Sequence, residues 1–99
     1  MSSYRVVGTK GSEIKSDILV HPGKLLGEEL EARNIFQKDF ADLIDLRPSH
    51  LNELIKGKRH ISAILSLKLE KHLGIDADFW MRLQVDYDLK VARKQLKVA

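Results

Sequence analysis

The spacing of hydrophobic residues changes at about residue 21. Before it, apolar residues form two loose clusters, Val6-Val7 and Ile18 to Val20. Neither cluster repeats at the 3.6-residue period of a helix, so residues 1–20 are predicted to form an N-terminal arm. This arm is expected to be flexible or to contain a short strand near Tyr4 to Val7.

After residue 21, apolar residues recur at helical spacing in segments separated by short breaks. Pro22 is expected at the first position of a helix, where its missing N–H is no loss, and this helix runs to about Arg33. A second helix is predicted from about Gln37 to Ile44. Because proline can begin a helix but not lie inside one, a third helix is predicted from Pro48 to Lys56.

Two more helices are predicted in the rest of the chain. Ser62 is a candidate cap for a fourth helix, which Gly74 ends. Asp76 or Asp78 can cap a fifth, whose end is the basic stretch Lys90 to Lys97. Since no segment after residue 20 alternates like a strand, the predicted fold is all-α, with five helices in one domain over residues 21–99.

The expected core follows from the apolar positions that share a helix face. They are Leu25, Leu26, Leu30, Phe40, Leu43, Ile44, Leu51, Leu54, Ile55, Ile64, Leu65, Leu69, Leu73, Phe79, Trp80, Leu83 and Tyr87. A chain of 99 residues has room for one such core, which excludes a large multi-domain enzyme.

Composition narrows the class of protein further. No apolar run is longer than three residues, so neither a membrane span nor a signal peptide is expected. The chain has no cysteine, which excludes disulfides and thiolate metal sites and makes the cytoplasm the expected location. The four histidines form no i, i+4 pair, and no nucleophile, base and orienting acid can be named. No enzyme, metal ion or small-molecule cofactor is therefore expected.

The net charge of +3 is spread unevenly along the chain. Residues 21–46 carry six acidic and three basic side chains, whereas residues 47–60 carry four basic ones and a single acidic one. This division indicates an anionic partner for the basic stretch, and a cationic partner for the acidic one. The alternative is that both are ordinary solvated faces.

The second and third predicted helices have the spacing of a helix-turn-helix. Each is two to three turns long, and only Asp45-Leu46-Arg47 separates them. Ala41 supplies the small side chain needed where the two helices cross, and Leu51 and Leu54 supply the buried side of the second one. The third helix of the chain is therefore the predicted reading helix.

The outer face of this reading helix is polar, as required to hydrogen-bond with base edges in the major groove. The residues on that face are Ser49, His50, Asn52, Glu53 and Lys56. Lys58 and Arg59, after the expected left-handed stop at Gly57, are placed to contact the phosphate backbone. Gln37, at the start of the preceding helix, and Arg47, at the start of the reading helix, complete the predicted DNA-binding set. For Glu53, which repels phosphate, a salt bridge to Arg47 or Lys56 is the alternative role.

These residues also resemble a known family. The stretches Gln37 to Ile44 and Asn52 to Arg59 look like the lambda-repressor-like (Xre) helix-turn-helix. Further blocks resemble the HigA-like (VapI-like) antitoxins of bacterial toxin–antitoxin modules. These blocks are His21-Pro22-Gly23, Arg47 to Glu53, and Phe79 to Gln84 followed by Tyr87 to Leu89. The resemblance covers about residues 21–89.

The resemblance implies a homodimer that represses its own operon by binding operator DNA. It also implies a second partner, a toxin that is typically a small basic ribonuclease. The acidic residues of the first two helices could meet such a toxin, and residues 1–20 could wrap it.

The sequence departs from the family pattern at three positions. Asp45 stands where the turn usually has glycine, and Phe36 and Arg47 stand where Ser or Thr often cap the two helices. Two alternatives therefore stay open. One is a free-standing phage-type repressor without a toxin, and the other is a toxin-binding protein-interaction module with weak DNA binding.

Overall fold

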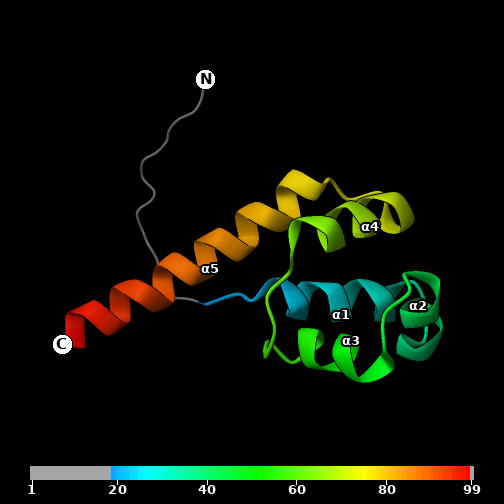
Figure 1. Cartoon of the computed structure of the whole chain (residues 1–99), viewed down its shortest axis with the longest axis horizontal. Helices are drawn as coiled ribbons and strands as arrows, with labels where there is room; N and C mark the ends of the chain where they lie inside the picture. Colours follow the sequence, from blue (N-terminus) through cyan, green and yellow to red (C-terminus); the bar gives the residue numbers. More distant parts are fainter. Residues whose placement is uncertain (1–18, 99) are drawn as a thin grey trace.

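The computed structural model describes residues 19–98, which form five α-helices and no strand (Figure 1). The helices are α1 (Pro22–Ala32), α2 (Gln37–Leu43), α3 (Pro48–Ile55), α4 (Ala63–Leu73) and α5 (Ala77–Val98). The all-α, five-helix prediction is therefore confirmed. The predicted arm and its possible strand lie outside the described residues, apart from Leu19 and Val20, whose side chains are exposed.

Helix α1 lies at the centre of the arrangement. It packs against α3 on one side and α5 on the other, while α2 packs against α3 and α4 against α5 (Figure 1). The second half of α5 extends beyond this body. Helix α3 thus lies on the opposite side of α1 from α5, and α2 lies near the end of α1 (Figure 1).

Side chains cap two of the helices. The Ser62 hydroxyl accepts a hydrogen bond from the Leu65 N–H at 3.1 Å, so the predicted cap of α4 is confirmed. At the start of α1, Nδ1 of His21 accepts from the Gly23 N–H at 2.9 Å. This role of His21 was not predicted from the sequence.

Two non-glycine residues adopt left-handed backbone conformations. Asp45, in the turn between α2 and α3, has φ 58°, and Asn34, after α1, has φ 59°. Asp and Asn tolerate this conformation better than most residues. The missing glycine therefore does not disrupt the turn of the helix-turn-helix.

The core is built largely from the predicted apolar residues. Its buried members are Leu26, Leu30, Phe40, Ala41, Ile44, Leu51, Leu54, Ile61, Leu65, Leu69, Leu73 and Trp80. Two predictions were wrong: Leu43 is 57% exposed and Ile64 69% exposed. Leu43 is the last residue of α2, and Ile64 lies in the first turn of α4, where the inward position is taken by Ser66.

Two glycines allow α1 to approach α3 closely. A β-carbon on Gly23 would lie 1.7 Å from the backbone oxygen of Leu54, a distance at which atoms overlap. A β-carbon on Gly27 would lie 2.8 Å from a methyl group of Ile55, which is a movable side chain. The contact at Gly23 therefore joins the backbones of α1 and α3 and fixes where α3 sits.

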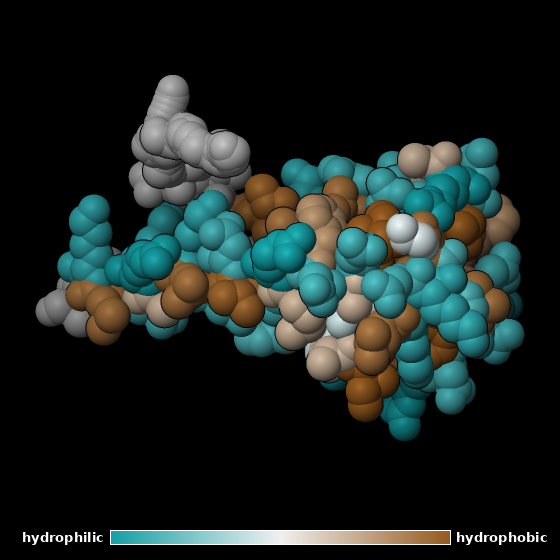
Figure 2. Space-filling view, turned by 90° about the horizontal axis from the view of Figure 1, so that it is seen from above, coloured by the Kyte–Doolittle hydropathy of each residue, from teal (hydrophilic) through white to brown (hydrophobic). Residues whose placement is uncertain are grey.

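Helix α5 is buried at its start and exposed toward its end. The Glu70 carboxylate accepts from the Ala77 N–H at 3.0 Å, and Trp80 is fully buried. Farther along, Val85, Leu89 and Leu96 are large exposed hydrophobic residues. Figure 2 shows hydrophobic residues along one edge of the projecting part of this helix. Over residues 19–98, no helix is long and apolar enough to cross a membrane.

Candidate nucleic-acid interface

The candidate interface is the outer face of α3 with the loop that follows it. Helix α3 buries Leu51 and Leu54 against α1 and α2, which leaves the polar residues of the same helix on the other side. Ser49 is exposed, and His50 and Asn52 are half-buried. These side chains can donate and accept hydrogen bonds, as reading a major groove requires.

A hydrogen bond joins the two helices of the pair across this face. Nδ2 of Asn52 donates to Oε1 of Gln37 at 3.3 Å, although the two residues are 15 positions apart in the chain. Gln37 is the first residue of α2 and is exposed. The contact brings together one predicted base-reading residue and one predicted phosphate-contacting residue.

Glu53 has a different partner from those predicted. Its carboxylate accepts a hydrogen bond of 2.6 Å from Nε of Arg59, whereas Arg47 and Lys56 were expected. The hydrogen bond and positive charge of Arg59 lower the pKa of Glu53 below its ordinary value. This exposed ion pair reduces the positive charge that Arg59 presents to solvent.

The loop after α3 carries basic side chains beside a groove of about 440 Å³. Lys56 is the C-cap of α3, and Gly57 turns the chain with φ 79°. The groove lies between α3 and α4, and its walls are mainly basic and histidine side chains with a few apolar ones. Its polar lining residues are His50, Lys58, Arg59, His60, Ser62 and Lys68.

Lys68 ties this groove to the helix-turn-helix pair. Its ammonium group donates to the backbone oxygen of Ile44 at 2.9 Å, just after the end of α2. Helix α4 thereby supports the turn between α2 and α3. This role of Lys68 was not predicted from the sequence.

The N-termini of the paired helices carry no side-chain cap. Phe36 precedes α2 and Arg47 precedes α3, and neither makes a capping hydrogen bond. Both side chains are exposed, and Phe36 is 77% exposed. The structure therefore places Arg47 at the edge of the reading helix, with its guanidinium accessible.

All nine predicted DNA-binding residues lie on α2, on α3 or in the short segments that flank α3. They are Gln37, Arg47, Ser49, His50, Asn52, Glu53, Lys56, Lys58 and Arg59. Hydrogen bonds bring together Gln37 with Asn52 and Glu53 with Arg59. Their contacts with DNA remain predictions.

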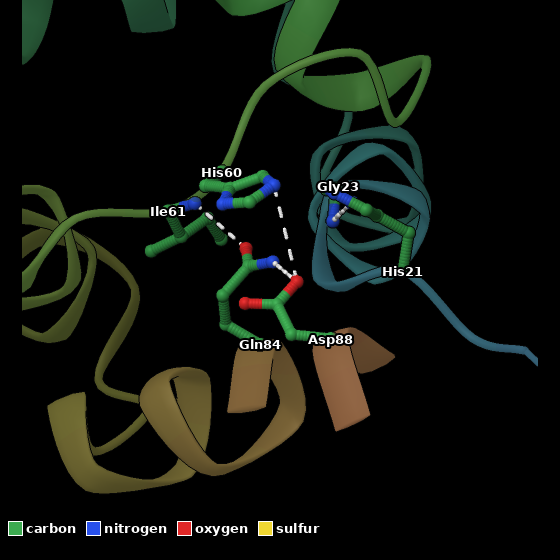
Figure 3. Close-up of polar contacts among 6 residues, drawn as sticks. All are labelled: His21, Gly23, His60, Ile61, Gln84 and Asp88. Atoms are coloured by element: carbon green, nitrogen blue, oxygen red, sulfur yellow. Dashed lines mark hydrogen bonds and ion pairs between the residues drawn. The ribbon is translucent and has the colours of Figure 1, made fainter. Parts of the chain in front are cut away.

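A polar cluster between the loop and α5, centred on Gln84, was not predicted from the sequence. Gln84 is buried, and its amide contacts both Ile61 in the loop and Asp88 in α5 (Figure 3). One signal was present in the sequence, because Gln84 stands four residues after Trp80 on an otherwise apolar stripe. A lone amide on a buried face indicates a polar partner nearby.

Comparisons with known proteins agree with this geometry. The helix-turn-helix family matches residues 26–80, more than half of the chain. Virulence-associated protein I of Dichelobacter nodosus is 36% identical over 76 residues, covering 76% of this chain and 70% of that protein.

Two solved structures share the fold closely. An addiction module antidote protein of the HigA family from Coxiella burnetii aligns with TM-score 0.72 at 32% identity, covering 77% of this chain and 84% of that one. The Pseudomonas aeruginosa antitoxin HigA, solved with the higBA promoter, aligns with TM-score 0.73 at 30% identity, covering 77% and 84%. The chain therefore belongs to the Xre-like helix-turn-helix family of DNA-binding regulators, and its fold is that of antitoxin proteins.

Proposed function

We propose that this protein is an antitoxin that neutralises a cognate ribonuclease-type toxin and represses its own operon as a DNA-bound dimer. The observation that carries the DNA-binding part is the polar outer face of α3 flanked by the basic loop. The fold that carries this face is similar to that of an antitoxin solved together with promoter DNA.

In the proposed complex, α3 enters the major groove. Asn52 reads a base edge while its bond to Gln37 holds the amide in place. Lys58, exposed in the loop, contacts a phosphate and contributes affinity without sequence preference.

The exposed apolar residues of α5 support a dimer. Val85, Leu89 and Leu96 are separated by four and seven positions, and Ala92 completes a seam with alternating steps of four and three. This is the spacing by which two helices pack along each other. A two-fold dimer would place its reading helices about 34 Å apart, on successive major grooves.

The acidic side of α1 and α2 supports a basic toxin as the second partner. A groove of about 650 Å³ lies beside α1 and the segment that joins it to α2, and Glu28 and Glu31 line it together with Lys24. Phe36, which neither caps α2 nor packs into the core, also lines this groove. Charge and exposed apolar surface are thus both available to a cationic protein.

Two substitutions test the DNA-binding proposal. Asn52→Ala should weaken binding to the upstream DNA of its own operon by about 1 to 3 kcal/mol while sparing unrelated DNA. Lys58→Ala should weaken binding to every duplex and reduce the salt slope by about one unit. Equal losses for Asn52→Ala on both DNAs would remove Asn52 from base reading.

Expression of the neighbouring reading frame tests the antitoxin proposal. That product alone should arrest growth, and co-expression with this chain should relieve the arrest through a complex that co-purifies. Growth without arrest and without a complex would instead favour the free-standing repressor. Toxin capture without salt-dependent DNA binding would favour the protein-interaction module.

A further inference from the structure

The loop that carries Lys58 and Arg59 is held at its far end by α5. Oε1 of Gln84 accepts a hydrogen bond of 2.7 Å from the Ile61 N–H, and Nε2 of Gln84 donates to Oδ1 of Asp88 at 3.0 Å (Figure 3). The Gln84 side chain is buried, with only 3% of the residue exposed. Both ends of its amide are therefore used, which fixes its orientation.

The near end of the same loop also reaches α5, through His21. The His21 ring lies 3.5 Å from the position that a β-carbon on Gly57 would occupy. On its other side the ring meets Tyr87 edge-on, with centroids 4.8 Å apart. Residues 84–88 of α5 thus bind the loop at Ile61 through Gln84, and Tyr87 contacts the His21 ring that lies beside Gly57.

Between these two supports, hydrogen bonds join the loop to α3, among them the 2.6 Å bond from Nε of Arg59 to the Glu53 carboxylate. The Lys58 N–H donates to the Glu53 backbone oxygen at 2.8 Å, and the next backbone N–H with an acceptor in the described chain is that of Ile61. His60 adds an ion pair when it is protonated, since its Nε2 lies 3.9 Å from Oδ1 of Asp88. The anchor at Gln84 therefore determines where the chain leaves the basic segment.

We infer that Gln84 and Asp88 are positioning residues for DNA binding. Neither faces the proposed DNA surface; they set the path of the loop and so the distance of Lys58 and Arg59 from the phosphate backbone. The inference rests on the DNA-binding part of the proposed function. It adds to that function a control of DNA affinity by α5, which packs on the opposite side of α1 from α3.

The position of residues 84–88 links DNA binding to dimer formation. Val85 and Leu89, on the exposed side of the same part of α5, belong to the surface proposed for the dimer. Pairing of two α5 helices would immobilise residues 84–88 and, through Gln84, the loop. Dimer formation and phosphate contact are then energetically coupled rather than independent.

The main test is Gln84→Leu, a change that removes both hydrogen bonds at nearly constant volume. Binding to the upstream DNA and to an unrelated duplex is measured over a range of salt concentrations, with circular dichroism to confirm folding. We expect a roughly tenfold or greater loss on both duplexes and a salt slope smaller by about one unit, because the Lys58 cation leaves the phosphates while Arg59 is already paired with Glu53. Unchanged affinity and slope in the folded variant would overturn the inference.

A matched control separates positioning from general loss of stability. Leu73→Ala also removes a buried side chain, but at the end of α4 and away from the loop. Measured well below its unfolding temperature, this variant should keep the wild-type slope. If it lost the slope as Gln84→Leu does, the effect would be one of stability, and the inference would fail.

A second variant provides a pH signature. Gln84→Glu keeps an acceptor for Ile61 but sets a carboxylate about 3.0 Å from that of Asp88. At neutral pH the two repel each other, and at lower pH they can share a proton. Affinity relative to wild type should therefore recover as the pH falls for Gln84→Glu and stay low for Gln84→Leu.

Two further outcomes are informative. If Gln84→Leu does not fold, Asp88→Asn, at a half-buried position, removes the carboxylate facing His60 and should lower affinity severalfold. Wild-type affinity in Asp88→Asn and no pH recovery in Gln84→Glu would together reject the inference. If the wild-type protein binds no DNA in a salt-dependent way, the proposed function itself fails.

Discussion

The helices of this protein begin in two different ways. Helices α1 and α4 have side-chain caps, from His21 and Ser62, whereas α2 and α3 follow Phe36 and Arg47, which cap nothing. The capped helices form the scaffold, and the uncapped ones form the helix-turn-helix. Side-chain caps, which stabilise a helix locally, are therefore found on two helices that support the candidate interface and not on the two helices that form it.

The uncapped pair is instead held by packing. Phe40 and Ala41 of α2 and Leu51 and Leu54 of α3 are buried, and the contact at Gly23 locks α3 against α1. A missing cap costs about 1 kcal/mol, which such burial can offset. Because packing holds α2 and α3, the residue before each helix need not cap it. At the start of α3 this position carries the exposed Arg47 side chain.

Gly23→Ala is expected to have the largest effect on stability, because it changes the contact that holds α3 against α1. The added methyl group would overlap the Leu54 backbone oxygen, so the free energy of unfolding should fall by about 3 kcal/mol or more. Gly27→Ala is the matched control, because there the Ile55 side chain can move aside. Urea denaturation measures both, and equal effects would show that the α1–α3 contact is adjustable.

Two substitutions, one that removes a helix cap and one that adds a cap, test how much capping contributes to stability. Ser62→Ala removes the bond to Leu65 and should lower stability by about 1 kcal/mol. Phe36→Ser introduces a capping hydroxyl at an exposed position and should raise stability by up to about 1 kcal/mol. Thermal unfolding of the two variants checks this, and a loss of stability in Phe36→Ser would mean that its ring supports the fold.

The cap of α1 should also respond to pH. Burial, followed by the charge of His60, lowers the pKa of His21 below its ordinary 6.5, against an opposing effect of Asp88. The unfolded chain therefore binds this proton more readily, so stability is fully present above pH 6.5 and falls as the pH drops below it. Protonation of Nδ1 would also remove the acceptor for Gly23.

The measurement is the unfolding temperature between about pH 7.5 and 5.5. His21→Asn retains a capping side chain without a titrating ring and should show a flatter profile than the wild type. Identical profiles for the two proteins would assign the pH dependence to other groups.

The smallest expected effect on folding is that of Glu53→Gln. The pair with Arg59 is exposed, so the unfolding midpoint should hardly change. Loss of the carboxylate releases Arg59 toward phosphate, and the salt slope of DNA binding should steepen by about one unit. Glu29→Gln, which loosens the exposed pair with Arg33 in α1, serves as the control and should leave DNA binding unchanged.

The helices and their ends were predictable because their signals are local. Pro22 and Pro48 begin helices, and Ser62 caps α4 while Gly74 ends it, each through the conformation of its own neighbourhood. The outer face of α3 was predictable for a related reason, since the buried residues of one helix define its exposed ones.

The errors have tertiary causes. Periodicity placed Leu43 and Ile64 on inward faces, but within residues 19–98 both side chains are exposed, one in the last turn of α2 and the other in the first turn of α4. The partner of Glu53 and the role of Gln84 depend on contacts between residues 6 and 23 positions apart, which no local pattern encodes. The residues on the outer face of α3 were thus predictable from the sequence, whereas the contacts that hold this face and its loop were not.

The contact at Gly23 has a consequence for how such proteins diverge. Because two backbones meet there, the placement of α3 does not depend on which side chains it displays outward. In the proposed complex with DNA, substitutions at positions such as Ser49 or Asn52 would alter the preferred operator while the placement of α3 stays constant. Paralogous copies of this gene in one genome could therefore acquire separate operators by changing a few exposed residues, and exchange of those residues should exchange their specificities.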